Sequence, residues 1–262
     1  MTKIHPTANV HPDAVIGDDV EIGPYSCIGE HVVIGDRTKI ESHVIIDGWT
    51  TIGKDNLVLH HAVVGSPPQD LAWKGDRSYL KIGDRNVIHE FVTISPGTKP
   101  ESETVIGNDC MLMVGVHVAH NDRIGNNVIL VNYTSLGGYV EVGDRAFLSA
   151  FVAVHQFVKV GTLAIVASFS KISQDFPPYM MGQDSPTVVY GLNVVGMRRA
   201  GFSQETRDLI KKAYMILYHD KFNFSDAVKV IEEDAALAKC KEVEILINFI
   251  KNSNRGICRH HV

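Results

Sequence analysis

The sequence predicts a mostly β protein, in which a parallel β-helix over about Ile4 to Ile172 is followed by a C-terminal α-helical cap. Every sixth residue from Ile4 to Ile172 is Ile, Val or Leu, with three exceptions. Many of these residues are followed by glycine, and Asp or Asn comes next or nearby. The six-residue period stops after Ile172, and a helical pattern appears from Ser203.

The six-residue period describes a short strand, a corner and another strand. The β-branched residue points into a narrow core, while Gly, Asp and Asn tolerate positive φ and form the corners. Successive coils then stack at the strand spacing of about 4.8 Å. If three repeats make one coil, residues eighteen positions apart lie above one another.

The three exceptions to the period are Asp70, Asp76 and Pro100, which fall in two polar stretches. Residues 66–79 and residues 95–104 therefore read as loops that leave the coil. Loops held on a rigid scaffold are favoured places for binding and catalysis.

We expect residues 1–190 to form the β-helix with its two loops and residues 191–262 to form the helical domain. Ser203 is suited to cap the first helix, a second helix follows Ser225, and a third runs near Glu242–Ile250. The apolar side of the first helix contains Leu209, Ile210, Ala213, Ile216 and Leu217. We expect these helices to cover the open end of the coil stack.

The composition, 262 residues with 45% hydrophobic residues, is that of an ordinary soluble protein. Neither a secretory signal nor a membrane span is apparent, so we expect a cytoplasmic protein. Four scattered cysteines indicate free thiols. The net charge of −5 argues against binding nucleic acid. Residues 190–262 carry twelve Lys and Arg against nine Asp and Glu, which fits an acidic partner or a phosphorylated ligand.

Three of the thirteen histidines, His117, His120 and His155, are candidates for chemistry. Stacking at eighteen residues puts His120 in line with Gly138 and Gln156, and a glycine beside a histidine leaves room for a ligand. Imidazole can act as a general base toward an alcohol or amine. Three converging imidazoles could instead bind zinc. The residues alone leave both chemistries open.

Several longer motifs carry a resemblance to one family. They are Ser-Pro-Pro-Gln-Asp-Leu (66–71), Ile-Gly-Asp-Arg-Asn (82–86), His-Val-Ala-His (117–120), Ala-Val-His-Gln-Phe (153–157), Gln-Asp-Phe-Pro-Pro-Tyr (174–179), Gly-Leu-Asn (191–193) and Arg-Arg-Ala-Gly-Phe-Ser (198–203). Together with the repeats, they resemble the UDP-N-acetylglucosamine O-acyltransferases over essentially the whole chain, including the cap.

The resemblance implies a left-handed parallel β-helix and a homotrimer with sites between subunits. It implies transfer of a 3-hydroxyacyl chain from acyl carrier protein to the 3-hydroxyl of UDP-N-acetylglucosamine, the first step of lipid A biosynthesis. His120 would be the general base of a direct transfer. The resemblance calls for no cofactor and no metal.

By the same resemblance, His117 and His155 would line the sugar and acyl site, Gln156 would assist, and Asn193 and Arg199 would lie near the nucleotide. The other substrate-binding positions it implies are Gln69, Asp70, Lys74, Gly138, Ser168 and Arg198. Basic residues of the cap, Arg198 and Arg199 with Arg207, Lys211 and Lys212, are expected to bind phosphate or the acidic carrier protein.

Some positions differ from the usual family pattern. Asn121 follows the base where aspartate is common, Ala72 replaces a lysine, Tyr139 replaces a histidine and Val195 replaces an acidic residue. Because an amide is not an anionic partner, we expect a backbone carbonyl or Gln156 to orient the imidazole instead. A paralogue that uses a UDP-amino-sugar or another acyl chain, a zinc hydro-lyase and a non-catalytic trimeric scaffold remain alternatives.

Overall fold

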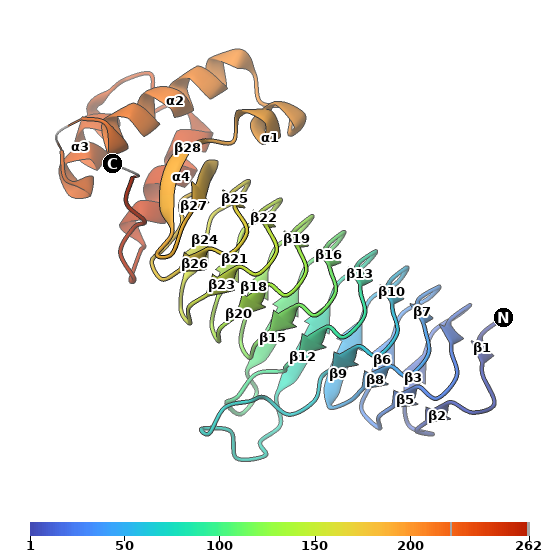
Figure 1. Cartoon of the computed structure of the whole chain (residues 1–262). Helices are drawn as coiled ribbons and strands as arrows, with labels where there is room; N and C mark the ends of the chain where they lie inside the picture. Colours follow the sequence, from blue (N-terminus) through green and yellow to red (C-terminus); the bar gives the residue numbers. More distant parts are fainter. Residues whose placement is uncertain (221, 261–262) are drawn as a thin grey trace.

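The computed structural model describes residues 1–220 and 222–260. Most of the chain winds into a long three-sided coil, and the helices gather at its C-terminal end, opposite the N-terminus (Figure 1). The β-strands that form the coil are almost all two residues long and parallel to their neighbours.

Each side of the coil is one sheet, and successive strands of the chain pass from the first to the second to the third sheet. The first sheet contains β1 (Lys3–Ile4), β4 (Glu21–Ile22), β7 (Lys39–Ile40), β10 (Leu57–Val58), β13 (Val87–Ile88), β16 (Met111–Leu112), β19 (Ile129–Leu130), β22 (Phe147–Leu148), β25 (Ile165–Val166), β27 (Met180–Gln183) and β28 (Val188–Leu192). The second contains β2 (Asn9–Val10), β5 (Cys27–Ile28), β8 (Ile45–Ile46), β11 (Val63–Val64), β14 (Thr93–Ile94), β17 (His117–Val118), β20 (Ser135–Leu136), β23 (Ala153–Val154) and β26 (Lys171–Ile172). The third contains β3 (Val15–Ile16), β6 (Val33–Ile34), β9 (Trp49–Ile52), β12 (Tyr79–Ile82), β15 (Glu103–Ile106), β18 (Arg123–Ile124), β21 (Glu141–Val142) and β24 (Lys159–Val160).

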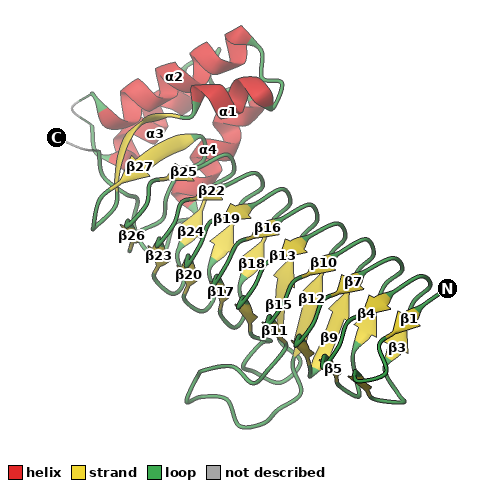
Figure 2. Ribbon diagram, turned by 45° about the vertical axis from the view of Figure 1, so that its right-hand side comes forward, coloured by secondary structure: helices red, strands yellow, loops and turns green. Residues whose placement is uncertain are grey.

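Three repeats make one coil, as the stacking argument assumed. Glu21 pairs with Lys3 and Lys39 pairs with Glu21, so equivalent residues are eighteen positions apart. The spacing is longer at two places: Leu57 pairs with Val87 and Val87 pairs with Met111. The additional residues leave the coil in two loops, one between β11 and β12 and one between β14 and β15 (Figure 2).

The interior of the coil is filled by the periodic apolar residues, and Ile52, Ile88 and Leu112 are completely buried. Buried amides satisfy the backbone at the corner before the first sheet. The side-chain oxygen of Asn56 accepts a hydrogen bond from the backbone N–H of Asn86 at 2.8 Å, and the oxygen of Asn86 accepts one from Cys110 at 2.8 Å. These amides allow a narrow corner to close without unpaired backbone groups.

The corners correct one prediction about glycine. Positive φ angles occur at Asp19, Arg37 and Asn127, among others, but not at Gly17 or Gly35. A Cβ atom on Gly35 would lie 2.6 Å from the carbonyl carbon of the glycine one coil further on. Asp and Asn supply left-handed backbone at some corners as predicted, but Arg, His and aromatic residues do so at many others. These glycines are needed instead because successive coils approach closely.

An antiparallel hairpin, β27 and β28, continues the first sheet and leads into four helices. The helices are α1 (Val194–Arg199), α2 (Gln204–Tyr218), α3 (Phe224–Glu233) and α4 (Lys241–Lys251). Ser203 caps α2 by accepting a hydrogen bond from the N–H of Thr206. The cap of α3 is Asn223, so this helix begins before Ser225 rather than after it. Within the described part of the chain, no helix has the length and apolarity needed to cross a membrane.

Candidate active site

A groove of about 500 Å³ lies at the corner between the second and third sheets, beside the two loops. Its walls are formed by strand ends of the second sheet and by the loop after β11. The lining residues are Gln69, Asp70, Ser95, His117, Ala119, His120, Leu136, Gly137, Gly138, Val154, His155 and Gln156. Seven of the site residues that were predicted from the sequence therefore lie together in one groove.

The predicted column of residues 120, 138 and 156 exists. The N–H of Tyr139 donates to the carbonyl of His120 at 3.1 Å, and the N–H of Phe157 donates to the carbonyl of Gly138 at 3.0 Å. A Cβ atom on Gly138 would lie 2.3 Å from Cε1 of His120. The imidazole itself therefore occupies the space beside this glycine, whereas the sequence predicted room for a ligand there.

The side chain of Asn121 orients His120, which corrects the prediction that a backbone carbonyl or Gln156 does so. Nδ1 of His120 lies 3.1 Å from Oδ1 of Asn121. The same oxygen accepts hydrogen bonds from the backbone N–H and the hydroxyl of Thr98, each at 3.1 Å. Because a backbone N–H can only donate, this atom is the amide oxygen, and Nδ1 must carry the proton that it accepts. The lone pair of the neutral ring is then on Nε2.

Asp70 reaches the other side of the same ring. Its Oδ2 lies 3.3 Å from Nε2 of His120, while its Oδ1 accepts a hydrogen bond from the N–H of Ala72 at 2.9 Å. Both side chains are largely buried, with 13% of His120 and 28% of Asp70 exposed. A doubly protonated His120 would thus donate to two oxygens, one neutral and one charged.

The two other histidines of the groove differ in their surroundings. Nδ1 of His117 lies 2.7 Å from the hydroxyl of Thr93, and burial, aided by the charge of His120, lowers the pKa of His117. His155 is exposed, and its Nδ1 lies 3.1 Å from the carbonyl oxygen of Gln156. His117 is therefore suited to a neutral hydrogen-bonding role beside the base.

Two family models match the chain. One, described as UDP N-acetylglucosamine O-acyltransferase, domain 2, matches residues 175–258, and one described as bacterial transferase hexapeptide (six repeats) matches residues 1–36. The acyl-[acyl-carrier-protein]–UDP-N-acetylglucosamine O-acyltransferase of Thermodesulfovibrio yellowstonii is 43% identical over 260 residues, which cover 99% of this chain and all of the relative. The chain belongs to this acyltransferase family.

Other relatives agree with this assignment. The enzyme of the same name from Syntrophobacter fumaroxidans is 44% identical over 98% of this chain and 100% of its own. The crystal structure of the Francisella novicida UDP-N-acetylglucosamine acyltransferase matches with a TM-score of 0.94 at 38% identity, covering 98% of this chain and 94% of that chain. The similarity to the acyltransferase family therefore includes both the coil and the helical cap.

The remaining residues selected from the sequence lie outside the groove of this acyltransferase-family chain. Lys74 is exposed and donates to the carbonyl of Leu71 at 3.0 Å. Ser168 is exposed on the corner between the first and second sheets. Arg198 and Arg199 are exposed on α1, at the end of the coil.

Asn193 has a structural role within one chain. It is 3% exposed, its amide nitrogen donates to the carbonyl of Leu163 at 2.8 Å, and its oxygen accepts from the N–H of Gly196 at 2.8 Å. These bonds cap α1 and fix it to the last full coil. The amide therefore positions the helix that carries Arg198 and Arg199.

Sequence reasoning missed Ser95, Thr98 and the part played by Asn121. The N–H of Ser95 donates to the carbonyl of Val118 at 3.0 Å, so Ser95 lies in the column that leads to His155. The eighteen-residue step fails here, because the loop after β14 makes the local spacing longer. The local step is 24 residues, so an eighteen-residue step that left six loop residues out of the count would have linked Ala119 to Ser95.

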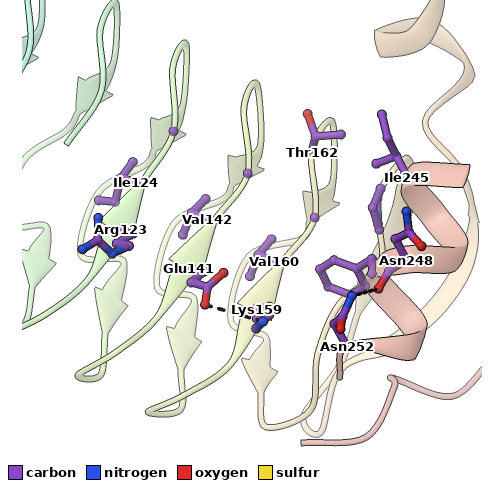
Figure 3. Close-up of a pocket in the computed structure, with 15 residues that line it drawn as sticks. Arg123, Ile124, Glu141, Val142, Lys159, Val160, Thr162, Ile245, Asn248 and Asn252 are labelled. Carbon is purple, nitrogen blue, oxygen red and sulfur yellow. Dashed lines mark hydrogen bonds and ion pairs between the residues drawn. The ribbon is translucent and has the colours of Figure 1, made fainter. Parts of the chain in front are cut away.

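A larger groove, of about 570 Å³, lies on the third sheet beneath α4 (Figure 3). Its charged residues include Arg123, Glu141 and Lys159, of which the last two form an ion pair at 3.6 Å. Its lining contains no histidine. Nowhere in residues 1–220 and 222–260 do three or more His, Cys, Asp or Glu side chains form a group that could hold a metal ion.

Proposed function

We propose that this protein transfers a 3-hydroxyacyl chain from acyl carrier protein to the 3-hydroxyl of UDP-N-acetylglucosamine, the first step of lipid A biosynthesis, and that it does so in the cytoplasm. The observation that carries the proposal is the setting of His120 in the groove, with Nδ1 engaged by Asn121 and Nε2 beside the carboxylate of Asp70. Support comes from relatives of that name that are 43% and 44% identical over nearly the whole chain.

The sugar hydroxyl is a poor nucleophile, so its proton must leave as the new bond forms. Nε2 of His120 takes this proton while the hydroxyl oxygen attacks the thioester carbonyl of the carrier-bound acyl chain. The C–S bond then breaks, and the imidazolium returns the proton to the departing thiol of the carrier. The acyl chain ends as an ester on the sugar, and the base is restored.

Asn121 and Asp70 suit the charged state of the base. When His120 holds both protons, Nδ1–H donates to the amide of Asn121, and the carboxylate of Asp70 lies 3.3 Å from Nε2. An interaction that strengthens as the imidazolium forms lowers the barrier rather than merely binding the substrate.

The transfer is direct in this proposal. Ser95 is the hydroxyl residue among those that line the groove, and it is 7% exposed. Among the described residues, no histidine is within hydrogen-bond distance of its hydroxyl, so the usual means of activating a serine is missing. His117, His155, Gln69 and Gln156 are assigned to binding the sugar and the acyl chain.

We further propose that the active protein is a homotrimer of left-handed coils. The residues assigned to the substrates form two sets on one chain: His120 and its neighbours are in the groove, while Ser168, Arg198 and Arg199 lie outside it, on another corner and on the cap. A second copy could bring the two sets together at its border. Exposed aromatic rings such as Phe151 (48%) and Phe169 (73%) would also be covered.

Light scattering at micromolar concentration tests the assembly, and a monomer would contradict it.

In the trimer, Arg198 and Arg199 are assigned to phosphate groups of the substrates, because the guanidinium fork fits phosphate oxygens. A KM for the carrier-bound donor that responds neither to salt nor to Arg199→Ala would exclude this assignment.

The decisive experiment measures acyl transfer by the pure protein, with a set of acyl carrier protein donors and UDP-sugars. We expect turnover with UDP-N-acetylglucosamine and a fall of about 10²–10⁴-fold in His120→Ala, the usual contribution of a placed base. His5→Ala, at an exposed histidine in the first coil, is the control. Turnover only with a UDP-amino-sugar would assign the protein to the paralogue, and His120→Ala retaining more than about a tenth of the rate would exclude His120 as the base.

A further inference from the structure

The segment after α4, residues 252–260, forms a C-terminal strap that returns to the end of the coil. The carbonyl of Gly256 accepts a hydrogen bond from the N–H of Asp175 at 2.7 Å, and the N–H of Cys258 donates to the carbonyl of Asp175 at 3.0 Å. Asp175 is completely buried. The backbone that follows Arg255 is therefore held against a fixed point of the coil.

The strap brings Arg255 to His155, one of the residues that line the groove. Its Nη2 lies 3.2 Å from Nδ1 of His155 and 3.4 Å from the carbonyl oxygen of Ser173. Its Nε is buried and has no hydrogen-bond partner among residues 1–220 and 222–260. Gly256, with φ of +74°, provides the turn directly after it. This arginine is thus placed in a defined position beside His155, although the two residues are 100 positions apart in sequence.

The two contacts of Nδ1 in His155 require opposite proton positions. A guanidinium only donates, so a hydrogen bond from Arg255 requires a lone pair on Nδ1. The carbonyl oxygen of Gln156, 3.1 Å from the same nitrogen, is satisfied only by a proton on Nδ1. In the neutral ring, Arg255 therefore favours the form with the proton on Nε2, and Gln156 favours the other form. The charged donor makes the stronger hydrogen bond.

We propose that Arg255 is a positioning residue that keeps the proton of His155 on Nε2, so that this N–H is available to donate to an oxygen atom of the substrate in the groove. The inference rests on the proposed function, because it assigns His155 to the substrate site. It extends the site from the coil to the C-terminal strap, and it gives His155 the role of a hydrogen-bond donor, distinct from that of the base.

The first test reads the proton position without turnover. In protein labelled with ¹⁵N-histidine, long-range proton–nitrogen spectra distinguish Nδ1–H from Nε2–H imidazole, and His155→Gln identifies the signal. We expect the Nε2–H form in the unsubstituted protein and the Nδ1–H form in Arg255→Met, where Gln156 is the partner that remains. Arg255→Lys should restore the Nε2–H form in part, since an ammonium also only donates. An Nε2–H signal that persists in Arg255→Met would overturn the proposal.

The second test measures acyl transfer. Arg255→Met should lower kcat/KM by about tenfold or more, the range for a hydrogen bond to a charged group. In a His155→Gln background, the same substitution should change kcat/KM by less than about twofold, because the partner is already gone. Equal losses in both backgrounds would reduce Arg255 to a structural role and refute the proposal.

Arg259→Met is the matched control, because it removes an exposed arginine from the same strap. It should alter neither the spectrum nor the rate. Failure of the unsubstituted protein to transfer any acyl chain would reject the proposed function, whereas the spectra would still decide the part played by Arg255. Thermal unfolding of each variant separates a local effect from loss of the fold.

Discussion

Oδ1 of Asn121 lies 3.1 Å from Nδ1 of His120 and is fixed in place by the backbone N–H and hydroxyl of Thr98. A neutral amide thus orients the base at a position where aspartate is common in the family that the sequence resembles. The contact links the base to the loop after β14, which contains Thr98. The geometry of the base accordingly depends on that loop.

Asn121→Leu should lower kcat by about tenfold or more, because Nδ1 loses its acceptor and the ring can rotate. Asn121→Asp should keep activity, because a carboxylate also accepts the hydrogen bond from Nδ1 and favours the imidazolium that forms during transfer. Steady-state kinetics between pH 5.5 and 9 would check both.

Asn127→Leu is the control for backbone strain, because Asn127 has φ of 56° and Asn121 has φ of 62°, yet Asn127 lies outside the groove. Leucine is strained equally at both corners. If the two leucine variants lost the same activity, strain alone would account for the result, and the orienting role of Asn121 would be rejected.

Asp70→Asn should lower kcat by about tenfold. A neutral amide would take the place of the carboxylate that lies 3.3 Å from Nε2 of His120, and it would stabilise the imidazolium less as that ion forms. Asp76→Asn changes an exposed carboxylate in the same loop and should have little effect. Rapid-quench measurement of a single turnover would show whether the loss is in the chemical step. A change confined to KM would instead assign Asp70 to substrate binding.

Gly138→Ala should reduce kcat/KM by about a hundredfold, because the new methyl group would lie 2.3 Å from Cε1 of His120 and must displace the ring. Gly191→Ala is the matched control, since a Cβ atom there meets nothing within 4 Å. Both variants should remain folded by circular dichroism. Full activity in Gly138→Ala would show that the ring has another position from which it can act.

The stability of the protein should depend on pH through His117. Burial lowers the pKa of this residue in the folded state, so between the folded value and the ordinary value of 6.5 the unfolded chain binds a proton that the folded chain does not. The free energy of unfolding is therefore highest, as far as His117 is concerned, above pH 6.5, and it decreases as the pH falls below that value. His117→Gln should therefore lose less stability than the unsubstituted protein between pH 7.5 and pH 5.5.

Urea unfolding at a fixed protein concentration measures this difference, and His5→Gln provides an exposed-histidine control. Parallel curves for the unsubstituted protein and His117→Gln across this pH range would show that His117 does not titrate differently on folding.

The part of the site that could be predicted from the sequence is the part that follows the coil. The alignment of His120 with Gly138 depends only on a coil of eighteen residues, and this length follows from three of the six-residue repeats. Asp70 and Thr98 lie in loops, whose conformation depends on contacts with the rest of the molecule. The contact between Arg255 and His155 joins the strap to the coil, and no local pattern contains it.

The same limit explains the error about Asn121. Its corner has φ of 62°, which brings the side chain back beside the preceding histidine. The sequence indicated an asparagine that tolerates such a corner, but the partner Thr98 that fixes its amide came from a loop whose path could not be predicted. The charge of the residue beside His120 therefore does not by itself predict which group orients the imidazole.

The two loops have a consequence for how this protein can change. β12 pairs with β9 and β15 along its whole length, so the coil closes beneath both loops as if they were absent. Lengthening a loop that leaves a closed scaffold costs closure entropy that grows only with the logarithm of its length. Asp70 and Thr98 are carried by such segments, whereas His120 and Gly138 belong to the coil itself. Loop exchange between homologues should therefore be an evolvable and engineerable route to new acceptor or donor preference, with the general base kept in place throughout.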